Sequence, residues 1–247
     1  KAILGIEFGS TRIKAILLDE NRNVIASGGH TWENRYVDGI WTYTMEDIIG
    51  GLQDCYAKMR EDFEGKYGEK LTTIGAIGIS GMMHGYLVFD KNGKQLAPFR
   101  TWRNTITGPA AAELMELFRF NIPQRWSIAH LYQAILNGEA HVPSIHKLVT
   151  LSVYIHYLLT GEVCVGVGEA SGMFPYDDEI GDFDATRVAQ FDELVKSYAF
   201  PWKLREIFPK VLRAGEQAGF LTEEGAKMVG LKPGIAVAVG TPDAHIS

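Results

Sequence analysis

The sequence predicts an α/β protein in which helices flank a mixed β-sheet and further helices are inserted between its strands. Three observations lead to this fold class. Short apolar runs bounded by Gly, Ser, Asn and Asp fill most of the first ninety residues, as strands would. One long segment among these runs has the periodicity of an amphipathic helix instead. The middle of the chain is dominated by helical spacing.

The chain opens with three predicted strands. They cover residues 2–8, 13–19 and 23–28, and a polar turn separates the second strand from the third. The tight turn of residues 9–11, with the sequence Gly-Ser-Thr, predicts a hairpin between the first two strands. The tip of such a hairpin can offer backbone N–H groups to an anion.

A long helix is predicted over residues 44–63, because its apolar residues recur on one face. Thr44 is followed three residues later by Asp47, which resembles a capping box. Buried strands are predicted next over residues 73–80 and 86–90. A helix followed by a buried strand indicates a mixed sheet with helices on its faces.

The rest of the chain is predicted to be mainly helical. The helices are expected over residues 108–120, 128–136, 144–159, 184–198 and 223–229. Gly161 and Gly230 would end two of them as C-caps. A last buried strand is predicted over residues 235–239 and opens into Gly240 to Ala244. The acidic stretch 177–184 is predicted to be a solvated loop.

Composition narrows the class of partner. Of the 247 residues, 46% are hydrophobic and 22% are charged, which is typical of a globular protein, and the formal net charge is −6. A mildly acidic chain without a basic block suits small molecules as partners, so we expect neither nucleic acid nor membrane. No segment has the roughly 18 apolar residues that a membrane helix needs. The two cysteines, Cys55 and Cys164, form no CxxC motif, which excludes a zinc ribbon or disulfide scaffold and favours the cytoplasm.

The first candidate site is the turn after the first strand. Glu7 at the strand end could hold a hydrated Mg²⁺, while Gly9, Ser10 and Thr11 could donate hydrogen bonds to phosphate. Lys14 adds positive charge nearby. From these residues alone, a tight hairpin with a surface acid is the other interpretation.

Two further segments could line a ligand pocket. Met83 and His84 follow a buried strand and are flanked by small residues, at a place where α/β proteins put ligand groups. Trp102, Arg103 and Asn104 combine an indole face, a guanidinium and an amide, which suits a sugar. The alternatives are a hydrogen-bonded structural histidine and a tryptophan half-buried at a domain edge.

Asp243 follows the last predicted strand. A carboxylate at the carboxyl end of a strand is free to accept a proton from a substrate hydroxyl. The alternative is that Asp243 caps the next helix. The sequence contains no nucleophile elbow, Walker A motif, Rossmann glycine fingerprint or protein-kinase motif.

Taken in order, five segments resemble the first half of the FGGY family of carbohydrate kinases. They are GIEFGSTRIKAILLD (5–19), GISGMMHGYLVFD (78–90), KLVTLSVYIHYLLTGE (147–162), GEASGMFPYD (168–177) and VLRAGEQAGFLTEEGAKMVGLKPGIAVAVGTPDA (211–244). The resemblance covers nearly the whole chain, and several motifs in the right order are more specific than any one alone. It implies an RNase H-like fold of the actin/hexokinase/Hsp70 superfamily.

The resemblance also implies a xylulokinase-like enzyme that uses ATP and Mg²⁺ to phosphorylate a hydroxyl of a ketopentose such as xylulose. Asp243 would be the general base and, together with Glu7, would hold the metal. The residues implied at the sugar are Met83, His84, Trp102, Arg103 and Asn104. The residues implied at the nucleotide phosphates are Gly9, Ser10, Thr11 and Lys14.

The chain departs from the family pattern in ways that keep alternatives open. Glu7 stands where the family usually has Asp, and Arg103-Asn104 stands where many members have Asn-Asp. The lost carboxylate at Asn104 and the gained cation at Arg103 suit a sugar acid such as an aldonate, or a polyol. A non-catalytic sugar sensor is also open. An actin-like or Hsp70-like assembly module is disfavoured, because it has no use for such a pocket.

Family members run to about twice this length. We therefore expect residues 1–247 to be the N-terminal sugar-binding domain, inactive alone, with the nucleotide-binding domain outside this chain. We leave the oligomeric state open, with a homodimer as one alternative.

Overall fold

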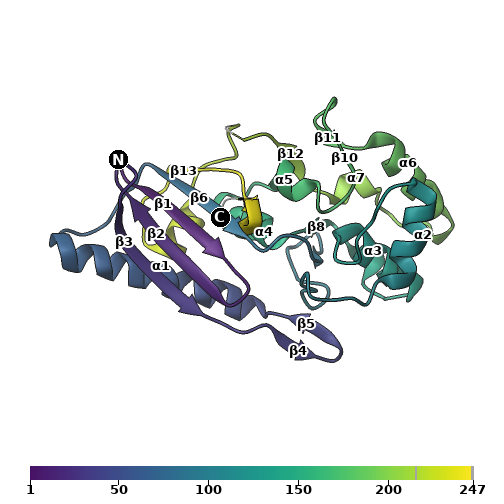
Figure 1. Cartoon of the computed structure of the whole chain (residues 1–247), viewed down its shortest axis with the longest axis horizontal. Helices are drawn as coiled ribbons and strands as arrows, with labels where there is room; N and C mark the ends of the chain where they lie inside the picture. Colours follow the sequence, from purple (N-terminus) through teal and green to yellow (C-terminus); the bar gives the residue numbers. More distant parts are fainter. Residues whose placement is uncertain (215, 246–247) are drawn as a thin grey trace.

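The computed structural model describes residues 1–214 and 216–245, which form a sheet region and a helical region (Figure 1). The strands of the large sheet are β1 (Ile3–Phe8), β2 (Arg12–Leu18), β3 (Val24–Thr31), β6 (Ala76–Gly81), β13 (Ala236–Val237) and β14 (Thr241–Pro242). Short strands pair outside it: β4 (Arg35–Val37) with β5 (Ile40–Thr42), β7 (Leu87–Phe89) with β8 (Lys147–Val149), β9 (Cys164–Gly166) with β12 (Lys210–Leu212), and β10 (Tyr176–Asp177) with β11 (Asp182–Phe183).

Some of the helices pack on the large sheet, and the others belong to the helical region. The α-helices are α1 (Met45–Tyr67), α2 (Gly108–Phe118), α3 (Ser127–Leu136), α4 (Leu151–Thr160), α5 (Val167–Ala170), α6 (Ala185–Leu194), α7 (Leu204–Ile207) and α8 (Glu223–Val229). The 3-10 turns are η1 (Val142–Ser144), η2 (Lys196–Tyr198) and η3 (Asp243–His245). None of the helices within the described ranges combines the length and the apolar character needed to cross a bilayer.

The large sheet is mixed, as the sequence predicts. β1, β2 and β3 form an antiparallel meander, and β6 runs parallel to β1 on its other side. β13 and β14 both pair in parallel with the far edge of β6. Val237 is level with Ile77, and Thr241 is level with Ser80. The chain thus advances four residues from β13 to β14 while β6 advances three. The extra residue between β13 and β14 is a β-bulge.

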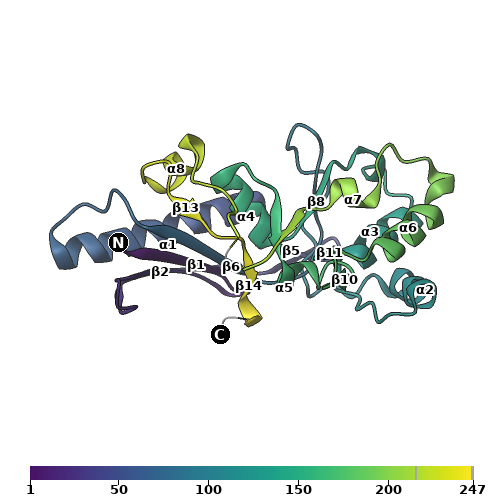
Figure 2. The same ribbon diagram turned by 90° about the horizontal axis from the view of Figure 1, so that it is seen from above.

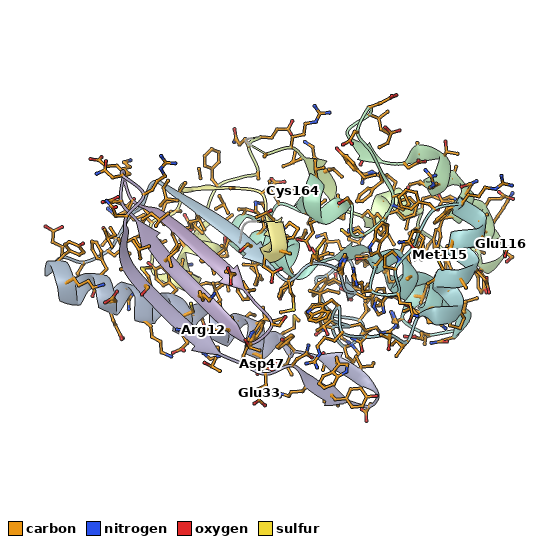
Figure 3. The ribbon with its side chains drawn as sticks, in the orientation of Figure 1. Arg12, Glu33, Asp47, Met115, Glu116 and Cys164 are labelled. Carbon is orange, nitrogen blue, oxygen red and sulfur yellow. The ribbon has the colours of Figure 1, made fainter. Side chains whose placement is uncertain are left out.

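Helix α1 covers one face of this sheet and begins where the capping box predicts. The Thr44 hydroxyl accepts from the Asp47 amide at 3.1 Å, and the Asp47 carboxylate accepts from the Thr44 amide at 3.1 Å. Asp47 also receives the Arg35 guanidinium, at the start of α1 in Figure 3. The left-handed Gly68 ends the helix. Both caps satisfy backbone groups that a helix leaves open at its ends.

The sheet is covered by helices on one face. Figure 2 shows α1, α4 and α8 on the same side of the strands. Alternate residues of β1 point into this layer and are buried, namely Leu4, Ile6 and Phe8. A single buried apolar cluster continues from there into the helical region. The two regions therefore share one core.

Two predicted elements are wrong. The helix expected over 144–159 begins only at Leu151, because Leu148 and Val149 belong to β8 and pair with β7. A continuous apolar run fits a buried strand as well as a helix, so periodicity alone did not separate them. The acidic stretch 177–184 includes the β10–β11 hairpin, in which Phe183 is buried, and is not simply a solvated loop.

The close approach of α1 to the sheet gives a stability prediction. A Cβ at Gly28 on β3 would lie 2.3 Å from the Cys55 carbonyl oxygen and 2.4 Å from the Met59 amide nitrogen, whereas one at Gly50 on α1 would touch nothing. We expect Gly28→Ala to lower the free energy of unfolding by about 1–3 kcal/mol, because backbone atoms must move. Gly50→Ala should instead raise it by up to about 1 kcal/mol through helix propensity. Urea unfolding of both variants tests this, and equal shifts would contradict the packing.

Candidate active site

The strands β1, β6 and β14 end at the same level. Phe8 is level with Gly81, and Gly81 is level with Pro242. The turn after β1, Met82 after β6 and Asp243 after β14 therefore leave the sheet at the same edge. Figure 1 shows that β1 and β6 end where the sheet meets the helical region. The Met82 amide donates to the Phe8 carbonyl at 2.9 Å, which extends the alignment by one step. Ligands of α/β proteins commonly bind at such a carboxyl edge.

A cavity of about 320 Å³ opens at this edge. It is lined by Ser10, Met82, Met83, His84, Trp102, Arg125 and Asp243. Its volume is at the lower end of the range for small-molecule sites. The structure thus brings together five of the residues that the sequence singles out, from four separate segments of the chain. Met82 and Arg125 were not among the candidates.

The turn between β1 and β2 is held rigidly by aromatic side chains. The Trp32 indole N–H donates to the Gly9 carbonyl at 2.8 Å, and the Tyr43 hydroxyl donates to the Ser10 carbonyl at 2.5 Å. The Trp32 amide donates to the Thr11 carbonyl at 3.2 Å. Burial raises the pKa of Tyr43 to about 12, so its hydroxyl remains a donor. The carbonyls of the turn are thus engaged by the protein itself.

His84 is held in an unusual backbone conformation. Its φ is +69°, and that of Gly85 is +95°. His84 is only 7% exposed, and its Nδ1 donates to the Gly172 carbonyl at 2.9 Å. A Cβ at Gly172 would lie 2.7 Å from the His84 ring and 2.9 Å from Met83 Cε. Strained backbone of this kind concentrates at functional sites.

Of the Trp102–Asn104 group, only Trp102 reaches the cavity. Trp102 is 40% exposed, and its indole N–H donates to Ser10 Oγ at 3.2 Å. The Arg103 guanidinium lies over the Trp41 ring, 4.1 Å from its centre. Asn104 is buried and bonds both backbone groups of Trp41, at 2.9 and 2.8 Å. The structure therefore places Arg103 and Asn104 outside the cavity lining, in contacts that fix the β4–β5 hairpin.

Glu7 and Lys14 lie beside the cavity on the uncovered face of the sheet. Lys14 Nζ is 3.1 Å from Glu7 Oε1, and both residues line a second cavity of about 300 Å³. Burial raises the pKa of Asp243, and the negative charge of Glu7 raises it further. The two carboxylates are thus close enough to repel each other, and a cation between them would relieve that repulsion.

This arrangement fits Mg²⁺. The ion usually takes one or two carboxylates and completes its shell with water and substrate phosphates. Within residues 1–214 and 216–245 there is no cluster of three or more His, Cys, Asp or Glu that could hold a metal by itself. Glu7 and Asp243 are the two carboxylates beside the cavity that could serve such an ion.

Glu169 is a buried carboxyl group that the sequence did not single out. It belongs to α5, which packs against β14, and it is 0% exposed. Its Oε2 accepts from the Ser152 hydroxyl at 2.7 Å. Burial raises its pKa to about 7, and the charge of Asp243 contributes to the rise. Nothing in the local sequence distinguishes this glutamate from an exposed one.

Comparison with known proteins agrees with the resemblance found in the motifs. The model of the FGGY family of carbohydrate kinases, N-terminal domain, matches residues 2–247. A xylulose kinase from Haemophilus influenzae is 24% identical over 256 residues, covering 97% of this chain and 50% of the relative. An L-fuculokinase from Escherichia coli is 24% identical over 254 residues, covering 96% and 49%. The chain spans about half the length of the curated relatives it matches.

Solved structures show the same fold. A xyloylose kinase from Brucella ovis superimposes with a TM-score of 0.80 at 22% identity, over 99% of this chain and 49% of that one. A gluconate kinase from Lactobacillus acidophilus superimposes with a TM-score of 0.77 at 18% identity, over 99% and 48%. These likenesses confirm the fold class that the motif resemblance implies.

Glu169 predicts a pH dependence of stability. Its pKa rises from 4.5 to about 7 on folding, so between these values the folded chain keeps a proton that the unfolded chain has released. The free energy of unfolding should therefore fall as pH rises through this window, by about 3 kcal/mol in total. In Glu169→Gln this fall of the unfolding free energy with pH should disappear. In Glu20→Gln, at an exposed site, the fall should remain. Urea unfolding at pH 4.5 to 8 measures both, and parallel curves for Glu169→Gln and the wild type would contradict the assignment.

Proposed function

The chain belongs to the FGGY family of carbohydrate kinases, and we propose that the full-length protein transfers a phosphoryl group from ATP to a hydroxyl of a small sugar. The observation that carries the proposal is the cavity shared by Asp243, His84 and Trp102, where β1, β6 and β14 end together. The relatives named xylulose kinase and L-fuculokinase support a monosaccharide as acceptor, and their names taken alone favour a ketopentose such as xylulose.

Asp243 would act as the general base. Burial and the nearby charge of Glu7 raise its pKa, which makes the carboxylate a better proton acceptor than a fully solvated aspartate. As the sugar oxygen attacks the γ-phosphorus, the hydroxyl proton passes to Asp243. The new oxygen–phosphorus bond forms as the bond to the β-phosphate oxygen breaks, and ADP leaves.

The sugar would be positioned by the other walls of the cavity. The indole face of Trp102 can stack on the C–H surface of a sugar, and its hydrogen bond to Ser10 fixes the ring. His84 is fixed by its bond to Gly172 and offers its ring beside the sugar. Fixed groups of this kind lower the entropic cost of reaching the reactive geometry.

The β1–β2 turn would face the nucleotide phosphates. Gly9, Ser10 and Thr11 would contribute donors, with Lys14 as a nearby cation. Glu7 and Asp243 would hold Mg²⁺, which when bound neutralises charge on the phosphates. The rigidity of the turn supports this role, because donors that need not reorganise stabilise developing charge best.

The adenine site would lie in the part of the protein outside this chain. Closure of the two halves would then exclude water from ATP. We therefore infer that residues 1–247 alone bind sugar but do not turn over ATP. A sugar sensor is the second candidate. It would bind sugar without releasing ADP even at full length.

Asp243→Asn tests the base. In the full-length protein we expect kcat to fall by about 10²–10⁴-fold, because general-base catalysis contributes that much. The dissociation constant for sugar should change little, since the amide keeps the shape of the carboxyl group. An ADP-release assay and calorimetric binding measure the two quantities. Asp178→Asn, in the exposed β10–β11 turn, serves as the control. An unchanged kcat in Asp243→Asn would refute the role of base.

A further inference from the structure

Three cationic side chains from segments that neighbour the cavity residues in the fold or sequence are engaged by the protein itself. These are Lys14 with Glu7, Arg100 with the partly buried Glu139, and Arg103 with the Trp41 ring. A cation that is already paired or stacked has less to gain from a ligand. These side chains therefore leave the recognition of a charged substrate to another group.

Arg125 is different. It lines the cavity together with Asp243 and is accessible to solvent. Across residues 1–214 and 216–245, its guanidinium has no ion pair, hydrogen bond or aromatic partner. An unengaged guanidinium presents a planar fork of donors that matches a carboxylate.

The place of Arg125 in the cavity is fixed by its backbone. The Gly85 amide donates to the Arg125 carbonyl at 3.3 Å. The Ser127 hydroxyl, two residues further along, donates to the Gly85 carbonyl at 2.7 Å. These two bonds clamp the segment before α3 onto the residues that follow His84. Arg125 is therefore carried by an anchored segment, next to the proposed sugar-binding histidine.

Arg125 and Asp243 line the same cavity, yet no ion pair joins them within the described part of the chain. Opposite charges that share a cavity without pairing suit a ligand with two kinds of group. One end would offer a hydroxyl to Asp243, and the other would offer an anion to Arg125. A neutral ketose would offer the guanidinium hydroxyl oxygens but no charge to pair with it.

Two anions are chemically possible, a carboxylate of the acceptor and a phosphate of the nucleotide. Lys14 and Glu7 line a separate cavity on the open face of the sheet, and Arg125 does not contribute to it. The cavity that holds Arg125 is the one with Trp102 and His84, which suit the acceptor. The placement favours the carboxylate.

We propose that Arg125 binds a carboxylate of the acceptor, so that the substrate class is a sugar acid such as an aldonate. This inference rests on the proposed kinase function of the same cavity. It also assigns the acid-binding role to Arg125, whereas the sequence alone pointed to Arg103.

The test compares acids with neutral partners of the same carbon chain. Calorimetry would measure binding of D-gluconate and D-glucitol, and of D-xylonate and xylitol, to the full-length protein. ADP release would be followed for the same compounds and for xylulose. The variants are Arg125→Gln and Arg125→Lys. Arg119→Gln is the matched control, because Arg119 ends α2 as an exposed residue outside the cavity lining.

The wild type should bind one of the aldonates more tightly than its polyol. Arg125→Gln should raise the dissociation constant of that aldonate by about 10- to 100-fold, which corresponds to the loss of a charge-assisted hydrogen bond. The dissociation constant of the polyol should change by no more than about 2-fold. Arg125→Lys should recover part of the affinity, since it keeps the charge but loses the fork. Arg119→Gln should leave both unchanged.

Several results would overturn the inference. Equal binding of aldonates and polyols by the wild type is one such result, and an equal loss of acid and polyol binding in Arg125→Gln is another. A rise in the KM for ATP with unchanged acceptor binding would assign Arg125 to phosphate instead. Failure of the kinase proposal looks different, because aldonate would then bind through Arg125 without ADP release. Turnover of xylulose without aldonate binding would keep the kinase and reject this inference.

Discussion

The parallel alignment of β1, β6 and β14 is the constraint on which the candidate site depends. β6 is hydrogen-bonded to β1 on one side and to β14 on the other, and Phe8, Gly81 and Pro242 share one level. Segments from the two ends of the chain therefore leave the sheet at one edge. The bulge before β14 sets which residue arrives there. Without its extra residue, Thr241 would be level with Gly81 and Asp243 would emerge one step further on, with its side-chain direction reversed.

The helical region contributes the remaining contacts of the site, and most of these contacts involve backbone groups. His84 is a non-glycine residue with positive φ, and such strain persists only where surrounding contacts enforce it. The Gly172 carbonyl holds the His84 ring, while the Arg125 carbonyl and the Ser127 hydroxyl hold Gly85. Because the buried core is continuous between the regions, these contacts fix the inserted segments relative to the sheet.

The sequence identified those cavity residues whose local signals coincide with the ends of strands. It did not identify residues whose position depends on contacts between distant segments. The Thr44 cap and the turn after β1 have short-range causes, so their residues identify them. The role of Asn104 depends on Trp41, which is distant in the sequence, and no local pattern announces that contact. Arg125 lies outside every recognised motif and joins the site only through the fold. The β8 strand was missed because Leu148 and Val149 are buried in either interpretation of that run.

The carboxyl groups around β14 explain how the site tolerates its own charge. Glu7, Asp243 and Glu169 come from different elements, yet the charge of Asp243 raises the pKa of Glu169, and that of Glu7 raises the pKa of Asp243. Glu169 is fully buried, and burial raises its pKa to about 7. Its protonated form below that pH carries no negative charge into the site. Asp243 is only partly buried, and burial together with the charge of Glu7 raises its pKa. Glu7 is half-buried and has Lys14 as a counter-charge. Burial is complete at Glu169 and only partial at Asp243 and Glu7, so the same kind of acid holds its proton more readily at Glu169 than at the other two positions.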